Sequence, residues 1–266
     1  MFQFTQKDQQ QLQQLGISKE KVNRYLEIFN EGIPFSEVRS AANVNEGIEA
    51  FSDEELKAFA QTYQEATQLK VVKFTPASGA ATRMFKAMHQ LMEQANSVEE
   101  FNSLLQKEKY AGLQKMANNL HQLPFYDAIV NAIENFEGLK PTEQAYQAFQ
   151  LMLNENGLGL DELPKGSIPF HKYNTSTASA FEEHFYEAAA YASKGGKAYL
   201  HFTISEEHQT KFENEFNEIK NRISKETKID FEVSFSFQKK ATDTLAVDLE
   251  NKPFRLTNGK LLFRPG

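Results

Sequence analysis

Residues 69–86, LKVVKFTPASGAATRMFK, give the clearest indication of the fold class. Its first six residues, 69–74, include two valines and a phenylalanine, which predicts a short strand. The small residues of 75–82 follow, with Gly79 among them, and predict a loop. From Met84 onward apolar residues recur at helical spacing. Strand, small-residue loop and helix in this order predict one βα unit.

Two more strands are expected in the second half of the chain. Residues 197–204 are mostly apolar, and residues 231–237 alternate strictly between apolar and polar side chains. A helix over about 179–193 and another that begins at Ser205 separate the strands. Strands that alternate with helices predict an α/β protein with a mostly parallel sheet.

The N-terminal segment, residues 1–68, is expected to be helical. Thr5, Ser18 and Ser52 each precede a helical pattern and are typical N-cap residues, and Gly16 follows the first pattern. These positions predict three helices ahead of the first strand.

The α/β domain is expected over residues 69–266, with a helical insertion over about 97–153. Within that insertion, apolar residues recur at helical spacing and Pro141 suits the first position of a helix. Near the end of the chain, Asn258-Gly259 predicts a hairpin turn.

Composition excludes several classes of protein. The chain has 266 residues, of which 40% are hydrophobic, so it can form a core and is not a disordered protein. Its 29 Lys and Arg against 36 Asp and Glu give a net charge of −7, which argues against nucleic acid as a partner. Cysteine is absent from the sequence, which excludes disulfides, thiolate zinc sites and cysteine nucleophiles.

No targeting or membrane segment is expected. No stretch approaches the roughly 18 uncharged apolar residues of a membrane helix. Residues 1–16 lack a basic region followed by an apolar core, so they do not resemble a signal peptide. We expect a cytoplasmic protein with no membrane partner.

The loop around Gly79 is a candidate phosphate site. Small residues let backbone N–H groups approach an anion, and the N-terminus of the following helix adds a positive dipole. Arg83 lies in the first turn of that helix, where a guanidinium can bind phosphate oxygens in pairs. The loop matches neither a Walker A motif nor G-x-G-x-x-G. An ordinary tight βα turn with a surface arginine explains the same residues equally well.

A second candidate segment is LPKGSIPFHKY, residues 163–173. Pro164 and Gly166 restrict the backbone around Lys165, whose ammonium group suits a phosphate. A surface lysine in a proline-rich connector is the competing interpretation, and the segment alone favours it. Histidines are spread through the second half of the chain without the paired spacing of a metal motif, so a histidine metal site is not expected.

Together the two segments resemble the nucleotidyltransferases of the sugar-1-phosphate class. The family's loop reads Gly-x-Gly-Thr-Arg-Met/Leu and is followed downstream by Pro-Lys, which match here at 82–84 and 164–165. The first glycine of the family corresponds to Ser78 or Gly79. The second glycine of the family is replaced here by Ala80 or Ala81. A weaker similarity to UDP-sugar pyrophosphorylases extends through the C-terminal half.

This resemblance implies a Rossmann-like, nucleotidyltransferase-like fold. It implies a reaction that joins a sugar phosphate to a nucleotide with release of pyrophosphate. In that reaction Lys165 bridges the α-phosphate and the incoming phosphate, Arg83 stabilises the leaving pyrophosphate, and Mg²⁺ links the groups. The expected nucleotide-binding residues are Pro76, Ala77, Ser78, Gly79, Ala80, Ala81, Thr82 and Gln238.

A closer resemblance covers nearly the whole chain. Residues 73–86, 163–173 and 238–255 resemble the bacterial domain-of-unknown-function family numbered 4301. Members of that family continue past the Arg-Pro-Gly of 264–266 with Gly-His-Gly and a strand that ends in aspartate. The resemblance therefore implies an N-terminal fragment with a sheet truncated at its C-terminus and a metal ligand beyond Gly266.

Two other functions remain open on the sequence. The altered glycine pattern is compatible with a module that binds a nucleotide or phosphate without turnover. Alternatively, the helices of residues 97–153 form the working surface of an interaction protein. The nucleotidyltransferase function predicts loss of nucleotide binding when Arg83 is changed, and the interaction-protein function predicts no loss.

Overall fold

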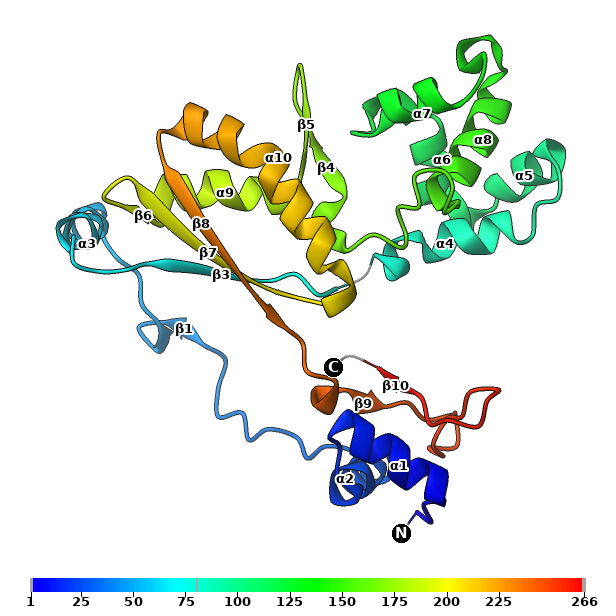
Figure 1. The fold of residues 1–266 in the computed structure, drawn as a ribbon, viewed down its shortest axis with the longest axis horizontal. Coiled ribbons are helices and arrows are strands. Elements are labelled where there is room, and N and C mark those ends of the chain that lie inside the picture. The colour runs from blue at the N-terminus through cyan, green and yellow to red at the C-terminus, as the bar shows by residue number, and fades with distance from the viewer. Residues whose placement is uncertain (1, 80, 265–266) are drawn as a thin grey trace. The chain divides into compact units, whose positions relative to one another are not determined.

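The computed structural model describes residues 2–79 and 81–264, and its contacts divide the chain into two compact units (Figure 1). One unit is formed by Met1–Gln68 together with Gln238–Gly266, and the other by Leu69–Phe237. The segment that follows the last strand of the main sheet therefore belongs to the same unit as the N-terminal helices.

The first unit contains helices and short strand pairs. Its elements are α1 (Gln6–Leu15), α2 (Lys19–Glu31), β1 (Asn43–Val44), β2 (Gly47–Ile48), α3 (Asp53–Glu65), the 3₁₀ turn η6 (Lys240–Thr242), β9 (Thr244–Leu245) and β10 (Phe263–Arg264). Thr5, Ser18 and Ser52 are the N-caps of the three helices, and Gly16, with φ 70°, ends α1. The predicted helix starts are confirmed, because each hydroxyl accepts a hydrogen bond from a first-turn amide.

A small core holds α1 and α2 against the C-terminal hairpin of this unit. Its buried residues are Leu12, Ile17, Val22, Leu245 and Leu261. Strand β9 pairs antiparallel with β10, and Arg255 forms an antiparallel bridge with Leu261. These pairings confirm the hairpin predicted from Asn258-Gly259.

A buried ion pair joins the two ends of this unit. Asp8 of α1 is almost completely buried, and Arg255 donates to both of its carboxylate oxygens, at 2.8 and 2.9 Å. The backbone N–H of Thr5 donates to the same carboxylate at 2.9 Å. The hydrogen bond from Arg255 is the main reason that the pKa of Asp8 falls from 3.8 to about 2.

We expect Arg255→Met to lower the stability of this unit at pH 7 by about 2 kcal/mol, which is the free energy that corresponds to the depressed pKa. Because the folded pKa of Asp8 is depressed, this stabilisation is present above pH 3.8 and is lost as pH falls towards 2. Urea unfolding of wild type and variant at pH 7 and pH 2.5 measures the difference. Arg24→Met is the control, because the pair of Arg24 with Glu27 is exposed. An equal loss at both pH values would contradict the assignment.

The second unit is built on a four-stranded sheet. Its strands are β3 (Val72–Pro76), β6 (Ser193–Lys194), β7 (Lys197–Ile204) and β8 (Asp230–Phe237). Strand β7 pairs in parallel with β3 and with β8, and β6 pairs antiparallel with the first residues of β7. The α/β class is confirmed. The first strand lies slightly later than the predicted 69–74, because its pairing with Tyr199–Thr203 sets its limits.

A large Rossmann-like sheet is not what the described residues form. The main sheet is small and mixed, and the other pairings of the described chain involve two strands each. The reason is the path of the chain. Between β3 and β7 it forms helices and the separate hairpin of β4 (Pro169–Lys172) and β5 (Thr177–Ser179), and after β8 it enters the first unit.

Two helices, α9 (Ala180–Tyr191) and α10 (Gln209–Thr227), cover one face of this sheet. The 3₁₀ turn η5 (Glu206–His208) precedes α10. Along β7 alternate residues from Ala198 to Ile204 are buried, as expected for a strand with one covered face. The rings of Phe181, Phe185 and Phe212 pack against Phe202 or against one another in the core below the helices.

The helical part of the second unit has a core of its own. Its elements are α4 (Thr82–Met92), α5 (Val98–Leu105), α6 (Ala111–Ala117), α7 (Tyr126–Ala132), α8 (Pro141–Leu153) and the 3₁₀ turns η1 (Glu108–Tyr110), η2 (Leu120–Gln122), η3 (Phe136–Gly138) and η4 (Lys165–Ser167). Phe101, Phe149 and Met152 are among its fully buried side chains. Pro141 begins α8 as predicted.

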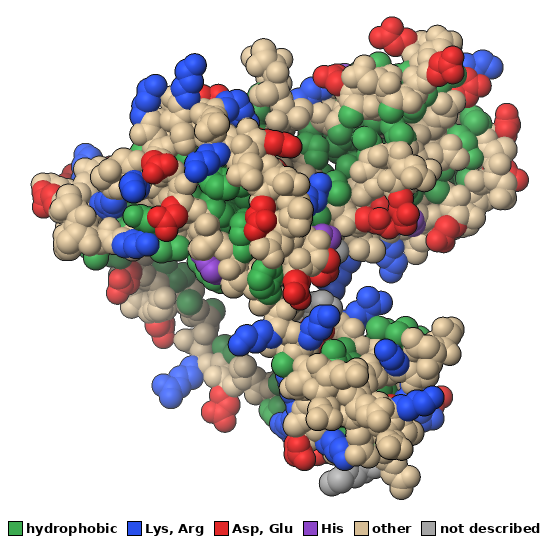
Figure 2. All heavy atoms as spheres, viewed as in Figure 1, with side chains coloured by type: hydrophobic (Ala, Val, Ile, Leu, Met, Phe, Trp, Pro, Cys, Tyr) green, Lys and Arg blue, Asp and Glu red, His purple; other side chains and the backbone are tan. Residues whose placement is uncertain are grey.

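Charged side chains of both signs are interspersed over the face of the molecule that Figure 2 shows. No helix in the described part of the chain combines the length and apolar character that crossing a membrane requires.

Candidate functional site

The loop that follows β3 is held at the C-terminal end of the strand. Beyond the last ladder pair, the N–H of Ala77 donates to the carbonyl of Thr203 at 2.7 Å. The hydroxyl of Ser205 donates to the carbonyl of Ser78 at 3.3 Å. The N–H groups of Ser78 and Gly79 donate no hydrogen bond to any residue that the structure describes. The loop is thus fixed while two of its donors stay free.

The Lys165 segment lies against this loop. The N–H of Lys165, in η4, donates to the carbonyl of Gly79 at 3.0 Å. The next residue, Gly166, packs on the ring of Phe212, where an added Cβ would lie 3.4 Å from a ring carbon. The Lys165 side chain is exposed and makes no ion pair or hydrogen bond within residues 2–79 and 81–264. Backbone contacts therefore place a free ammonium group beside the loop.

The loop, η4 and the start of α9 enclose a cavity of about 290 Å³, which we call the loop cavity. It is lined by Thr75, Pro76, Ala77, Gly79, Lys165, Gly166, Phe170, Ala180, Phe181, His184 and Phe202. Aromatic rings form much of its wall, and the polar groups lie at the loop, at Lys165 and at His184. A few polar groups in an otherwise apolar cavity are typical of small-molecule sites.

The predicted site residues divide into two sets. Pro76, Ala77, Gly79 and Lys165 line the loop cavity, so the structure brings the two candidate segments together. The predicted residues that do not line it are Ser78, Ala81, Thr82 and Arg83, and Ala80 lies outside the described residues. Gln238 belongs to the other compact unit.

Arg83 occupies the first turn of α4 and is exposed. Within the described chain its guanidinium has no ion-pair partner. The N-cap of α4 is Ala81, which is buried and supplies no side-chain hydrogen bond to the helix. The N–H of Met84 donates to the carbonyl of Ala81 at 2.8 Å. The Arg83 guanidinium and the N–H groups of Thr82 and Arg83 have no partner in the described chain and are available to an anion.

His184 is a lining residue that sequence reasoning missed. It lies one turn before Glu187 on α9, and its Nδ1 is 3.2 Å from the Glu187 carboxylate. Glu187 also pairs with Lys73 of β3, which is the largest reason that the pKa of Glu187 falls to about 2. The carboxylate therefore stays ionised and orients the imidazole. The i, i+3 spacing of the histidine and the glutamate was the available signal.

Glu215 of α10 is a second residue that sequence reasoning missed, and its carboxylate contacts the start of α9. Ser179, the N-cap of this helix, accepts from the N–H of Glu182 at 3.0 Å and donates to the carboxylate of Glu215 on α10. Burial is the main cause of the raised pKa of Glu215. The sequence offered no motif for this contact, because it depends on the packing of α9 against α10.

The described residues contain no group of three or more His, Asp or Glu side chains that could hold a metal ion. The lining of the loop cavity contains no carboxylate. We therefore assign no residue of this cavity as a metal ligand.

No curated protein and no solved structure matches this chain. A family model does match, and it covers residues 5–266, which include the loop, the Lys165 segment and the C-terminal hairpin. The chain belongs to the family described as Domain of unknown function (DUF4301).

Proposed function

We propose that this protein binds a nucleotide at the loop cavity and acts as a nucleotidyltransferase that joins a sugar phosphate to the nucleotide. The observation that carries the proposal is the hydrogen bond from the N–H of Lys165 to the carbonyl of Gly79, at 3.0 Å, with both residues lining one cavity. Two segments that resemble the phosphate-binding parts of sugar-1-phosphate nucleotidyltransferases are thereby joined.

The electrostatics of the loop favour an anion. Partial positive charge comes from the free N–H groups of Ser78 and Gly79 and from the uncapped start of α4. A full positive charge comes from the unpaired ammonium of Lys165. A phosphate held by these groups replaces water as their hydrogen-bond partner. Hydrogen bonds to a charged group contribute about 1.5–3 kcal/mol each.

Transfer of a nucleotidyl group needs little covalent chemistry from the protein. An oxygen of the sugar phosphate attacks the α-phosphorus in line, and the bond to pyrophosphate breaks. Lys165 would neutralise charge between the two phosphates, and Arg83 would stabilise the leaving group from the first turn of α4. Mg²⁺ stays a prediction without assigned ligands, and no step of this proposal depends on it.

A module that binds a nucleotide without turnover is the second candidate. The lining of the loop cavity has no carboxylate to act as a base or to hold a metal. This observation favours binding alone.

A thermal-shift panel of nucleoside triphosphates tests binding, and release of pyrophosphate in the presence of sugar 1-phosphates tests catalysis. We expect stabilisation that rises with nucleotide concentration, because ligands of the native state raise its stability by mass action. Binding with no pyrophosphate release across the panel would support the second candidate. Absence of binding to any nucleotide would contradict both.

We expect Gly79→Val to weaken nucleotide binding by about tenfold or more, because the side chain blocks the approach of a phosphate to the loop amides. A Cβ at Gly79 meets no atom within 4 Å, so the free energy of unfolding should change by less than about 0.5 kcal/mol. Isothermal titration gives the affinity. Gly112→Val is the control, since its Cβ also has open space and Gly112 lies on α6, away from the loop cavity. Equal affinity in the two variants would contradict the role of the loop.

A further inference from the structure

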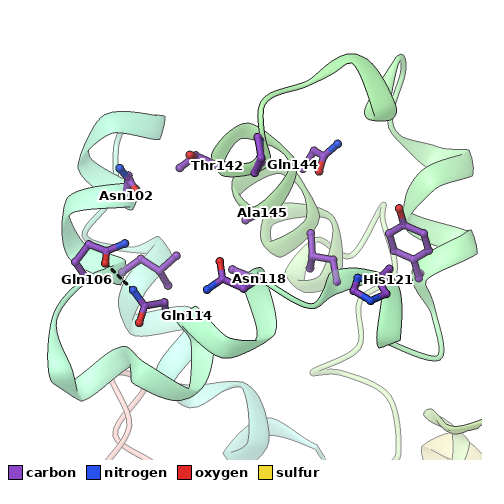
Figure 3. Close-up of a pocket in the computed structure, with 13 residues that line it drawn as sticks. Asn102, Gln106, Gln114, Asn118, His121, Thr142, Gln144 and Ala145 are labelled. Atoms are coloured by element: carbon purple, nitrogen blue, oxygen red, sulfur yellow. Dashed lines mark hydrogen bonds between the residues drawn. The ribbon is translucent and has the colours of Figure 1, made fainter.

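The helical part of the second unit contains another cavity, of about 260 Å³, which we call the amide cavity (Figure 3). It shares no lining residue with the loop cavity. Helices α5, α6 and α8 form its walls, and η2 and α7 close one end. Its lining residues are Asn102, Leu105, Gln106, Gln114, Ala117, Asn118, Leu120, His121, Tyr126, Pro141, Thr142, Gln144 and Ala145.

Uncharged hydrogen-bonding side chains dominate the polar lining. Figure 3 shows Gln106 and Gln114 on the α5–α6 side, where the amide of Gln114 donates to Gln106 at 2.6 Å. The side chains of Asn102, Asn118 and Thr142 have no hydrogen-bond partner in the described part of the chain. Each free amide offers donors and an acceptor together.

The lining also contains apolar side chains. Leu105, Leu120 and Ala145 are buried, and Tyr126 contributes its ring. His121 and Gln144 also line the cavity, and the Gln144 amide already donates to the carbonyl of Phe136 at 2.9 Å. The cavity thus presents apolar surface beside a set of unpaired amides.

Charge is missing from this lining. No Asp, Glu, Lys or Arg is among its residues. The ammonium of Lys172 lies 5.8 Å from the centre of the Tyr126 ring, but it already donates to the carbonyl of His121 at 2.7 Å. A bound anion would therefore lose its water without meeting a free Lys or Arg side chain, which is unfavourable.

We propose that the amide cavity binds one uncharged sugar ring. A sugar hydroxyl both donates and accepts, which matches the free amides of Asn102 and Asn118. The C–H face of the ring suits the apolar side chains of Leu105, Leu120 and Ala145 and the ring of Tyr126. The volume lies below the usual range of about 300–1,000 Å³ for drug-sized ligands, which favours a single ring over a chain. This site is separate from the nucleotide site and does not depend on it.

The test is isothermal titration of the full chain with D-glucose, D-galactose, D-mannose and the trisaccharide maltotriose. We expect at least one of them to bind, and expect Asn102→Leu and Asn118→Leu each to weaken that binding by about tenfold. Asn131→Leu is the matched control, because Asn131 is exposed on α7 and does not line the cavity. Preference for a monosaccharide identifies a free sugar as the ligand, and preference for maltotriose identifies the end of a glycan.

Folding of the variants is checked by their melting temperatures. Leucine forms helices better than asparagine, so Asn102→Leu should not destabilise α5. Thr142→Val keeps the shape of the side chain and removes only its hydrogen-bonding group, which gives a third variant. Three results would overturn the proposal: no binding of any of the four sugars, equal binding by wild type and the folded variants, or tighter binding of glucose 6-phosphate that depends on Asn118.

Discussion

Replacing Lys165 by alanine is expected to weaken nucleotide binding by about 10- to 150-fold, the range that corresponds to one lost hydrogen bond to a charged group. The loop itself should stay in place. It is the backbone N–H of residue 165 that binds the carbonyl of Gly79, and alanine keeps that group. The exposed side chain contributes little to folding, so the melting temperature should be unchanged.

Isothermal titration of wild type and variant measures this effect. Lys225→Ala is the matched control, because Lys225 is exposed near the end of α10 and has no ion-pair partner in the described chain. Its affinity should equal that of wild type. If the two lysine variants bind equally well, the attraction is a property of overall charge and the loop cavity is not the site.

Phe181→Ala should lower the free energy of unfolding by about 3–5 kcal/mol, as is usual for a fully buried phenylalanine. Phe181 has no exposed surface. Its ring centre lies 5.2 Å from that of Phe185, 4.7 Å from Phe202 and 5.0 Å from Phe212, so the substitution opens a cavity where α9, α10 and the sheet meet.

Guanidinium unfolding followed by circular dichroism gives this free energy. Phe74→Ala is the control, because Phe74 is 60% exposed. Its effect should be much smaller. Equal losses in the two variants would contradict the position of the core on one face of the sheet.

Local signals explain which parts of the fold were predictable. Thr5 and Ser52 start helices because their hydroxyls bind amides within the same turn, and the alternation from 231 to 237 follows from one buried face. The extent of the sheet depends on where the chain goes after each strand. That path is set by contacts between distant residues, so the sequence did not reveal that the main sheet would be small and mixed.

The sequence predicted those parts of the candidate site that lie in the two segments around Gly79 and Lys165. Gly79 and Lys165 were singled out from their local residues and by resemblance, and the structure places them side by side. His184 and Phe170 complete the loop cavity through the packing of α9 and β4. The spacing of His184 and Glu187 indicated their contact on one helix, but no motif indicated that either His184 or Phe170 lines the cavity. The amide cavity could not be predicted from the sequence either, because its asparagines and glutamines come from separate helices.

The most direct test of the proposed function is a crystal structure of the protein with the nucleoside triphosphate that stabilises it most. The account predicts phosphate oxygens within hydrogen-bond distance of the Ser78 and Gly79 amides and of the Lys165 ammonium. A well-ordered triphosphate bound elsewhere, with the loop cavity free of phosphate, would contradict it.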